Sequence, residues 1–216
     1  QSGYIYVSGI TTNFLGNLED SSSTSEYGAR NVLLLHGSRF SARTWQDLGT
    51  LSVLADAGYR VAAVNLHSYL EKRRIDDPRT ITYIPRDELL EGICNALGMS
   101  EANPAVIISP SMSGSFSVPL LLRKPSMFAG FVPVAPGTAA DYSTEEFAGV
   151  TGVPVLVVYG QKDSLGTRVS KILSAIPGSH LIMIKGAGHP AYLDEPDLFH
   201  EHLLEFLKYD IFYGKR

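Results

Sequence analysis

The residues Ile108-Ser109-Pro110-Ser111-Met112-Ser113-Gly114 have the spacing of a sharp strand-to-helix turn in this 216-residue chain, although this motif is weak by itself. They follow the apolar run Ala105–Ile108 and place small residues two positions before and two positions after Ser111. A strand that turns sharply into a helix needs this spacing, because bulky side chains there would clash with neighbouring backbone. Such a turn presents a serine hydroxyl at the start of a helix, where the amide of Met112 can face an oxyanion. Ser111 is therefore a candidate nucleophile.

Two other serines allow a different interpretation of the same segment. Ser109 and Ser113 can serve as helix-capping residues, which would make the segment an ordinary turn. Ser113 also has small neighbours two positions away, Ser111 and Ser115. We prefer Ser111 because the apolar strand is expected to end directly before Ser109, which sets the register of the turn.

Apolar runs predict a hairpin followed by a mostly parallel sheet. The hairpin has strands Tyr4–Val7 and Thr12–Leu15, with a turn near Ser8-Gly9. Six further strands are expected, at Val32–Leu35, Val61–Val64, Ala105–Ile108, Gly130–Val134, Val155–Tyr159 and Leu181–Ile184. Continuous apolar runs suit parallel strands that are covered on both faces. The fold class is therefore α/β, as one domain with a hairpin and loop over residues 1–30 and a core over 31–207.

Helical patterns lie between these strands. Leu48, Leu51 and Leu54 follow Thr44, which we expect to be an N-cap, and a last helix is expected over about 197–207. Another helix is expected to bury one face, formed by Leu165, Val169, Ile172 and Ile176. The segment Pro136–Pro154 has room for one small helix, Thr144–Ala148. We therefore expect an open site without a large lid.

Two further polar residues follow later strands. Asp163 comes after the strand that ends at Tyr159, and by itself it is better explained as the N-cap of the next helix. His189 follows the last strand in the glycine-flanked loop Gly186–Pro190. Ligands of parallel sheets bind at the carboxyl ends of the strands, where all three residues are expected to meet. The order Ser111, Asp163, His189 indicates a nucleophile, an orienting acid and a base.

The first long strand ends in His36-Gly37-Ser38-Arg39. The backbone amide of Ser38 or Arg39 is a candidate second oxyanion donor beside that of Met112. His36 is expected to bond to backbone and shape this turn rather than to catalyse. The remaining histidines show no metal-ligand spacing, so no metal is expected; they are His67, His180, His200 and His202.

Composition limits the partners of the chain. Its net charge of −4 and pI of about 5.9 argue against nucleic acid or an anionic membrane as the main partner. The single cysteine, Cys94, excludes an intrachain disulfide and is expected to be buried. No apolar run approaches the roughly 20 residues that span a bilayer. We expect a monomer in the cytoplasm, with the nucleus as a second compartment, although the chain begins at Gln1 and a removed N-terminal anchor stays open.

Longer segments resemble the α/β-hydrolase domain-containing protein 14 family, which includes the CCG-interacting factor B type. The matching segments are Leu33–Ser41, Thr44–Leu51, Ile108–Gly114, Phe131–Pro136, Val158–Gly160 and Gly186–Asp194. The resemblance implies an α/β-hydrolase fold, a triad of Ser111, Asp163 and His189, and oxyanion donors at Ser38 or Arg39 and at Met112. It also implies esterase activity on short acyl esters. One member type is associated with removal of acetyl groups from lysine, with coenzyme A as acyl acceptor and no bound cofactor.

The chain departs from the family in one loop. The family has Asp-Leu-Pro-Gly-x-Gly after the second core strand, whereas this chain has residues Asn65–Arg74 with no such motif. Lys72-Arg73-Arg74 and Arg39 are candidates to contact phosphates of coenzyme A, and the alternative is a solvated charge run. Two other functions stay open. One is a carboxylesterase with water as acceptor, and the other is a non-catalytic binding or scaffold protein on a hydrolase fold.

Overall fold

The computed structural model describes residues 1–18, 31–66 and 84–212. In this part of the chain, strands form one sheet in the order β1-β2-β4-β3-β5-β6-β7-β8. The strands are β1 (Ser2–Val7), β2 (Ile10–Gly16), β3 (Asn31–Leu34), β4 (Arg60–Val64), β5 (Ala105–Pro110), β6 (Phe128–Val134), β7 (Leu156–Gly160) and β8 (His180–Ile184). The hairpin β1–β2 pairs antiparallel with β4, and all neighbours from β4 to β8 are parallel. The predicted α/β fold class is confirmed.

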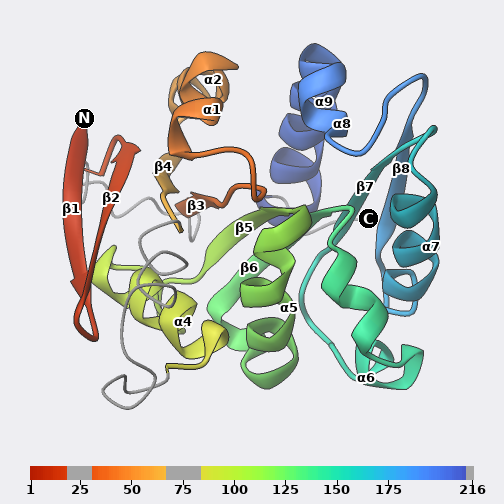
Figure 1. Ribbon diagram of the computed structural model, residues 1–216, viewed down its shortest axis with the longest axis horizontal. Helices are drawn as coiled ribbons and strands as arrows, with labels where there is room; N and C mark the ends of the chain where they lie inside the picture. Colours follow the sequence, from red (N-terminus) through yellow and green to blue (C-terminus); the bar gives the residue numbers. More distant parts are fainter. Residues whose placement is uncertain (19–30, 67–83, 213–216) are drawn as a thin grey trace.

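Helices cover both faces of the sheet (Figure 1). One face is covered by α4 (Arg86–Ala96), α5 (Gly114–Arg123), α6 (Thr144–Ala148) and α7 (Ser164–Leu173). The other is covered by α1 (Ala42–Asp47), α2 (Thr50–Asp56), α8 (Ala191–Asp194) and α9 (Pro196–Phe206). Alternate strand residues point into the two layers, as Leu33 and Leu34 do, and both are fully buried. This double burial explains why the core strands are continuous apolar runs.

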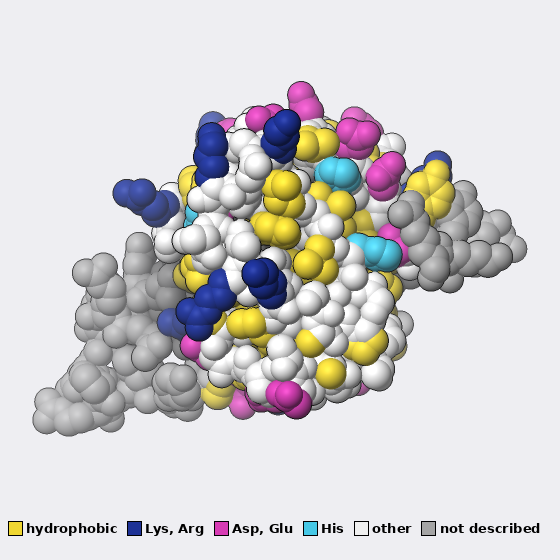
Figure 2. All heavy atoms as spheres, turned by 90° about the vertical axis from the view of Figure 1, so that its right-hand side faces the viewer, with side chains coloured by type: hydrophobic (Ala, Val, Ile, Leu, Met, Phe, Trp, Pro, Cys, Tyr) yellow, Lys and Arg dark blue, Asp and Glu magenta, His cyan; other side chains and the backbone are white. Residues whose placement is uncertain are grey.

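Short helical turns complete the described elements. They are η1 (Ser111–Ser113), η2 (Pro125–Met127), η3 (Gly137–Asp141) and the π-helical η4 (Leu207–Phe212). The segment between β6 and β7 contains only η3 and α6, and α6 has the predicted bounds. The strand β8 is the outermost in the described sheet, and Figure 2 shows apolar side chains gathered in the middle of this side of the molecule.

Two local expectations were wrong, and a third was wrong in part. The strand β5 does not end before Ser109 but continues to Pro110, because Ser109 and Pro110 pair with Pro133 and Val134 of β6. The end of the strand therefore does not single out Ser111, whereas its positive φ of +50° does.

The helix expected after Thr44 is two helices with other caps. Ser41 is the N-cap of α1, and Thr44 instead forms the reciprocal bond of its capping box. Gly49, with a φ of +76°, then ends the first helix and begins α2. A left-handed residue cannot continue an α-helix, so the leucine pattern crosses a break.

The predicted buried face of α7 is only partly right. Val169 and Ile176 are buried and Ile172 packs against the core, as expected, but Leu165 is exposed. Gly166, Ser170 and Leu173 are buried in addition. Small residues bring this helix close to the strands, because a Cβ on Gly166 would lie 3.1 Å from the Cβ of Tyr159. Periodicity in apolar residues alone does not reveal a contact made through glycine and serine.

Candidate active site

Ser111 occupies a strained backbone position between β5 and α5. Its φ is +50°, in the left-handed region that side-chain-bearing residues rarely adopt. Such a conformation costs roughly 1–3 kcal/mol, so the surrounding structure must hold it. Gly114 allows the helix to pass the loop after β6, because a Cβ there would collide with Pro136. The turn holds the half-buried Ser111 at the carboxyl end of β5.

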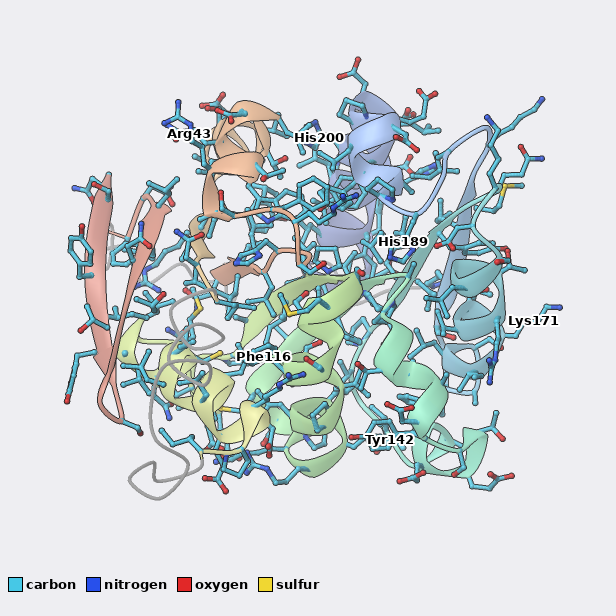
Figure 3. All side chains as sticks on the ribbon, in the orientation of Figure 1. Arg43, Phe116, Tyr142, Lys171, His189 and His200 are labelled. Atoms are coloured by element: carbon cyan, nitrogen blue, oxygen red, sulfur yellow. The ribbon has the colours of Figure 1, made fainter. Side chains whose placement is uncertain are left out.

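Ser111, His189 and Asp163 form one hydrogen-bonded chain. The Ser111 Oγ lies 2.8 Å from His189 Nε2, and His189 Nδ1 lies 2.6 Å from Asp163 Oδ2. An ionised carboxylate only accepts hydrogen bonds, so Nδ1 carries the proton and Nε2 of the neutral ring accepts from the serine hydroxyl. In Figure 3, His189 lies between the start of α5 and the start of α7. The order of these three groups is the one needed to deprotonate a serine.

Asp163 has both of the roles that the sequence left open. It is the N-cap of α7, where its Oδ1 accepts from the amide of Leu165 at 3.1 Å. The other oxygen, Oδ2, bonds to His189. A Cβ on Gly166 would lie 2.6 Å from Oδ2, so glycine leaves the room that this oxygen needs. The carboxylate is 8% exposed, which keeps competing water away from the imidazole.

The loop that carries His189 is fastened to the loop that carries Asp163. The amide of Lys162 donates to the carbonyl of Ala187 at 2.9 Å. Gly160 permits this contact, because a Cβ there would collide with the carbonyl of Gly188. Asp194 then accepts from the amide of Gly188 at 2.6 Å. The side chain of His189 is 39% exposed, so the imidazole is held by Asp163 at Nδ1 while part of the ring stays accessible to solvent.

Asp194 and Gly160 were not identified as part of this site from sequence. Asp194 lies beyond the histidine loop, and its position in a short helical turn resembles that of any surface carboxylate. Of the two glycines that precede His189 in its loop, Gly186 has a φ of +78°, which residues with a side chain rarely adopt. Gly188 does not adopt a positive φ and serves instead as a close neighbour of Asp194.

The residues after β3 lie beside Ser111. A Cβ on Gly37 would be 3.8 Å from the Cβ of Ser111, which brings the turn preceding Ser38 and Arg39 next to the candidate nucleophile. His36 shapes this turn, as expected. It is fully buried, and its Nε2 accepts from the amide of Leu66 at 2.8 Å, so Nδ1 carries the proton and donates to the carbonyl of Gly37 at 2.8 Å.

Ser113 lies away from the open side of the turn. It is completely buried, and its hydroxyl donates to the carbonyl of Pro110 at 2.8 Å. Ser109 is also completely buried. Neither hydroxyl can meet a substrate in this arrangement, so Ser111 is the candidate that the geometry favours among the three.

Cys94 does not take part in this hydrogen-bonded chain. Cys94 is buried as expected, and burial raises the pKa of its thiol to about 12, which keeps it unreactive.

Within residues 1–18, 31–66 and 84–212, no group of three or more His, Cys, Asp or Glu side chains could hold a metal. In the same ranges, no helix is long and apolar enough to cross a membrane. The divergent loop from His67 onward, with Lys72-Arg73-Arg74, lies outside the described residues.

Two solved structures share this fold. The chain is similar to a predicted CIB-like hydrolase from Thermoplasma acidophilum, with a TM-score of 0.78, 24% identity, and coverage of 96% of this chain and 97% of that one. It is also similar to the carboxylesterase CesB from Bacillus subtilis, with a TM-score of 0.72, 18% identity, and coverage of 96% and 91%. These likenesses and the order of the strands show that the chain has the α/β-hydrolase fold.

Curated relatives narrow the class to one family. The chain is 42% identical to ABHD14B of Homo sapiens over 178 residues, which cover 82% of this chain and 83% of that protein. It is 37% identical to ABHD14A of Rattus norvegicus over 177 residues, covering 82% and 71%. No protein-family model matches the chain. The chain belongs to the α/β-hydrolase domain-containing protein 14 (ABHD14) family, as its motifs predicted.

Proposed function

We propose that this chain is a serine acyl hydrolase or acyltransferase that works through an acyl-enzyme at Ser111. The observation that carries this proposal is the hydrogen-bonded chain from Ser111 through His189 to Asp163, at a serine with a φ of +50°. Strained backbone and a base held by a buried carboxylate occur together where a nucleophile is prepared.

The first half of the reaction forms the acyl-enzyme. His189 Nε2 takes the proton from Ser111 as Oγ attacks the acyl carbonyl, and Asp163 stabilises the imidazolium that results. The negative charge on the carbonyl oxygen is accepted by the amide of Met112 and by that of Ser38 or Arg39. His189 then returns the proton to the departing alcohol or amine, which leaves the acyl group as an ester on Ser111. An acceptor repeats these steps in reverse and releases the serine.

We propose acetylated lysine in a peptide or protein as the substrate class, with short acyl esters as simpler substrates. The human relative ABHD14B is named as a candidate protein-lysine deacylase, and it is 42% identical over most of both chains. The short connection between β6 and β7 also supports a bulky substrate. It contains only η3 and α6, and its length led us to expect no large helical lid over the site. The exposed imidazole of His189 is consistent with this open approach.

The acyl acceptor decides between a transferase and a simple esterase. We propose coenzyme A as a co-substrate, with exposed Arg39 as a contact for its phosphates. The test incubates the protein with an acetyl-lysine peptide, with and without coenzyme A, and measures acetyl-coenzyme A and acetate. Formation of acetyl-coenzyme A, reduced in Arg39→Ala at physiological salt, supports transfer. Acetate alone, at a rate unaffected by coenzyme A, indicates water as the acceptor.

A fluorophosphonate probe separates an enzyme from a binding protein on the same fold. The probe forms a stable bond with an activated serine, so wild-type protein should be labelled at Ser111 while Ser111→Ala should not. Thr50→Val is a matched control, because it removes a different histidine-bonded hydroxyl and should be labelled like wild type. Absence of labelling in the wild type would contradict the catalytic proposal and favour the binding protein.

A further inference from the structure

Three buried serine hydroxyls lie directly beneath the turn at Ser111. The Ser109 Oγ is 2.6 Å from the Ser117 Oγ and 3.0 Å from the Ser113 Oγ. The Ser113 hydroxyl donates to the carbonyl of Pro110 at 2.8 Å. All three serines are completely buried. The cluster connects the end of β5 to the second turn of α5, the two elements that Ser111 joins.

The direction of this chain follows from counting hydrogens. Each serine hydroxyl has one hydrogen to donate. That of Ser113 is used on Pro110, so Ser113 accepts from Ser109. That of Ser109 is then used on Ser113, so Ser109 accepts from Ser117. The three hydroxyls therefore donate in one direction, from Ser117 to the carbonyl of Pro110, and such aligned bonds strengthen one another.

The last acceptor of the chain is the peptide that sets the conformation of Ser111. The carbonyl of Pro110 belongs to the peptide plane between Pro110 and Ser111, and rotation of that plane about the N–Cα bond is the φ of Ser111. Fixing this carbonyl resists relaxation of the strained φ of +50°. Ser109 and Ser113 also occupy the two positions at which the usual form of this turn has glycine, which has no hydroxyl to donate.

We propose that Ser109, Ser113 and Ser117 are positioning residues that hold the Pro110–Ser111 peptide, and with it the Ser111 hydroxyl, in line with His189. The proposal rests on the nucleophilic role proposed above for Ser111. None of the three touches the substrate. Their hydroxyls act through the backbone, so their loss should slow the attack of Ser111 and leave substrate binding unchanged.

The test measures kcat and KM for a small acetyl ester, and the rate of fluorophosphonate labelling, in three variants. Ser113→Ala removes the bond to Pro110 and should lower kcat and the labelling rate by about 10- to 100-fold, because small misplacements of a reacting group have effects of this size. Ser109→Ala should have a smaller effect and Ser117→Ala the smallest, following their distance from Pro110 along the chain. KM and the shape of the pH–rate profile should be unchanged, since the His189–Asp163 pair is untouched.

Ser170→Ala is the matched control. Ser170 is a buried helical serine whose hydroxyl donates to the carbonyl of Thr167, three residues earlier, at 2.9 Å, but it lies away from Ser111. Its variant should lose stability without losing kcat. Ser113→Thr is the conservative variant, because a threonine hydroxyl in a helical turn can make the same bond, and it should recover most of the lost rate.

Three outcomes would overturn the proposal. The first is wild-type kcat and labelling in Ser113→Ala. The second is a loss of kcat that is proportional to the drop in unfolding temperature in all four alanine variants, including the control Ser170→Ala. The third concerns Ser109→Ala, which is the variant to use if Ser113→Ala does not fold. The proposal fails if this variant has a reduced kcat while its crystal structure shows the Pro110–Ser111 peptide in the wild-type position. A wild type that is neither labelled nor active would instead overturn the nucleophile assignment, and the positioning role with it.

Discussion

Two histidines in this molecule bond to a hydroxyl at the same distance, yet only one has the surroundings of a base. His189 Nε2 lies 2.8 Å from the hydroxyl of Ser111, and His200 Nε2 lies 2.8 Å from that of Thr50. Behind His189, the carboxylate of Asp163 bonds to Nδ1 at 2.6 Å. His200 belongs to α9, is 8% exposed and bonds to Thr50 of α2. Burial lowers its pKa, and the charge of Asp197 only partly opposes this.

The difference is in the environment rather than in the pair itself. Thr50 is fully buried in the first turn of a regular helix, whereas Ser111 is half-buried and held at a positive φ. The imidazole of His200 is kept neutral by burial, so protonating it is unfavourable. The imidazole of His189 instead bonds through Nδ1 to the carboxylate of Asp163, which orients the ring toward Ser111. A histidine–hydroxyl bond therefore indicates a nucleophile only where a carboxylate and an accessible, strained serine accompany it.

The largest expected effect is that of removing the Ser111 hydroxyl. Ser111→Ala should lower kcat on a small acetyl ester by about 10⁴- to 10⁶-fold, because the covalent route is then closed. Circular dichroism and the unfolding temperature should stay close to wild type. If purified Ser111→Ala keeps its turnover, and further purification does not lower it, another residue carries out the reaction. His189 would then differ from His200 only in its surroundings and not in its role.

The carboxylate behind His189 should matter almost as much. Asp163→Asn should lower kcat by about 10³- to 10⁴-fold, because an amide can stabilise the wrong tautomer of His189 and carries no charge. Asparagine is also a good N-cap, so α7 should stay intact. Asp163→Ala should lose the cap as well, with about 0.5–2 kcal/mol less unfolding free energy in urea titrations. Equal kcat in Asp163→Asn and wild type would show that the carboxylate serves only the helix.

The Thr50–His200 pair should affect stability alone. Thr50→Val leaves the Nε2 of His200 without this partner inside the protein and should cost about 1–3 kcal/mol of unfolding free energy. Denaturant titration measures this cost, and kcat on the acetyl ester should not change. A drop in kcat comparable to that of Asp163→Asn would mean that the second pair also takes part in the reaction.

The smallest expected effect is a dependence of stability on pH. The folded pKa of His200 is lowered by burial, so from just above the ordinary value near 6.5 downward the unfolded chain binds more protons than the folded one. Stability is then present above the unfolded pKa and is lost as the pH falls. The unfolding temperature of the wild type should fall more steeply over this range than that of His200→Gln. Parallel curves for the two proteins would contradict this.

Much of the architecture follows from local patterns in the chain. Apolar runs such as Val61–Val64 predict core strands because a parallel strand must bury both faces. The small residues around Ser111 predict the sharp turn from strand to helix, and the short Pro136–Pro154 segment predicts the small α6. These features depend on residues that are near one another in sequence.

Other features escape such patterns because their causes lie in distant residues. The strand β5 gains Ser109 and Pro110 only because β6 is there to pair with them. Ser109 and Ser113 cannot be distinguished from ordinary caps until burial brings their hydroxyls within bonding distance. Asp194 is one more surface carboxylate until the histidine loop presents the amide of Gly188 to it.

The chain order of Ser111, Asp163 and His189, and their places after separate strands, can be read from the linear chain, because strand periodicity and turn chemistry are local. Whether the three side chains meet cannot be read there. Ser111 and His189 are 78 residues apart, and the sheet order β5-β6-β7-β8 brings their loops to one edge. Only this packing decides whether Ser111 and His189 form the 2.8 Å hydrogen bond or merely belong to motifs in the right order. A hydrogen bond requires contact within about 3 Å, and spacing along the sequence does not measure distance in space.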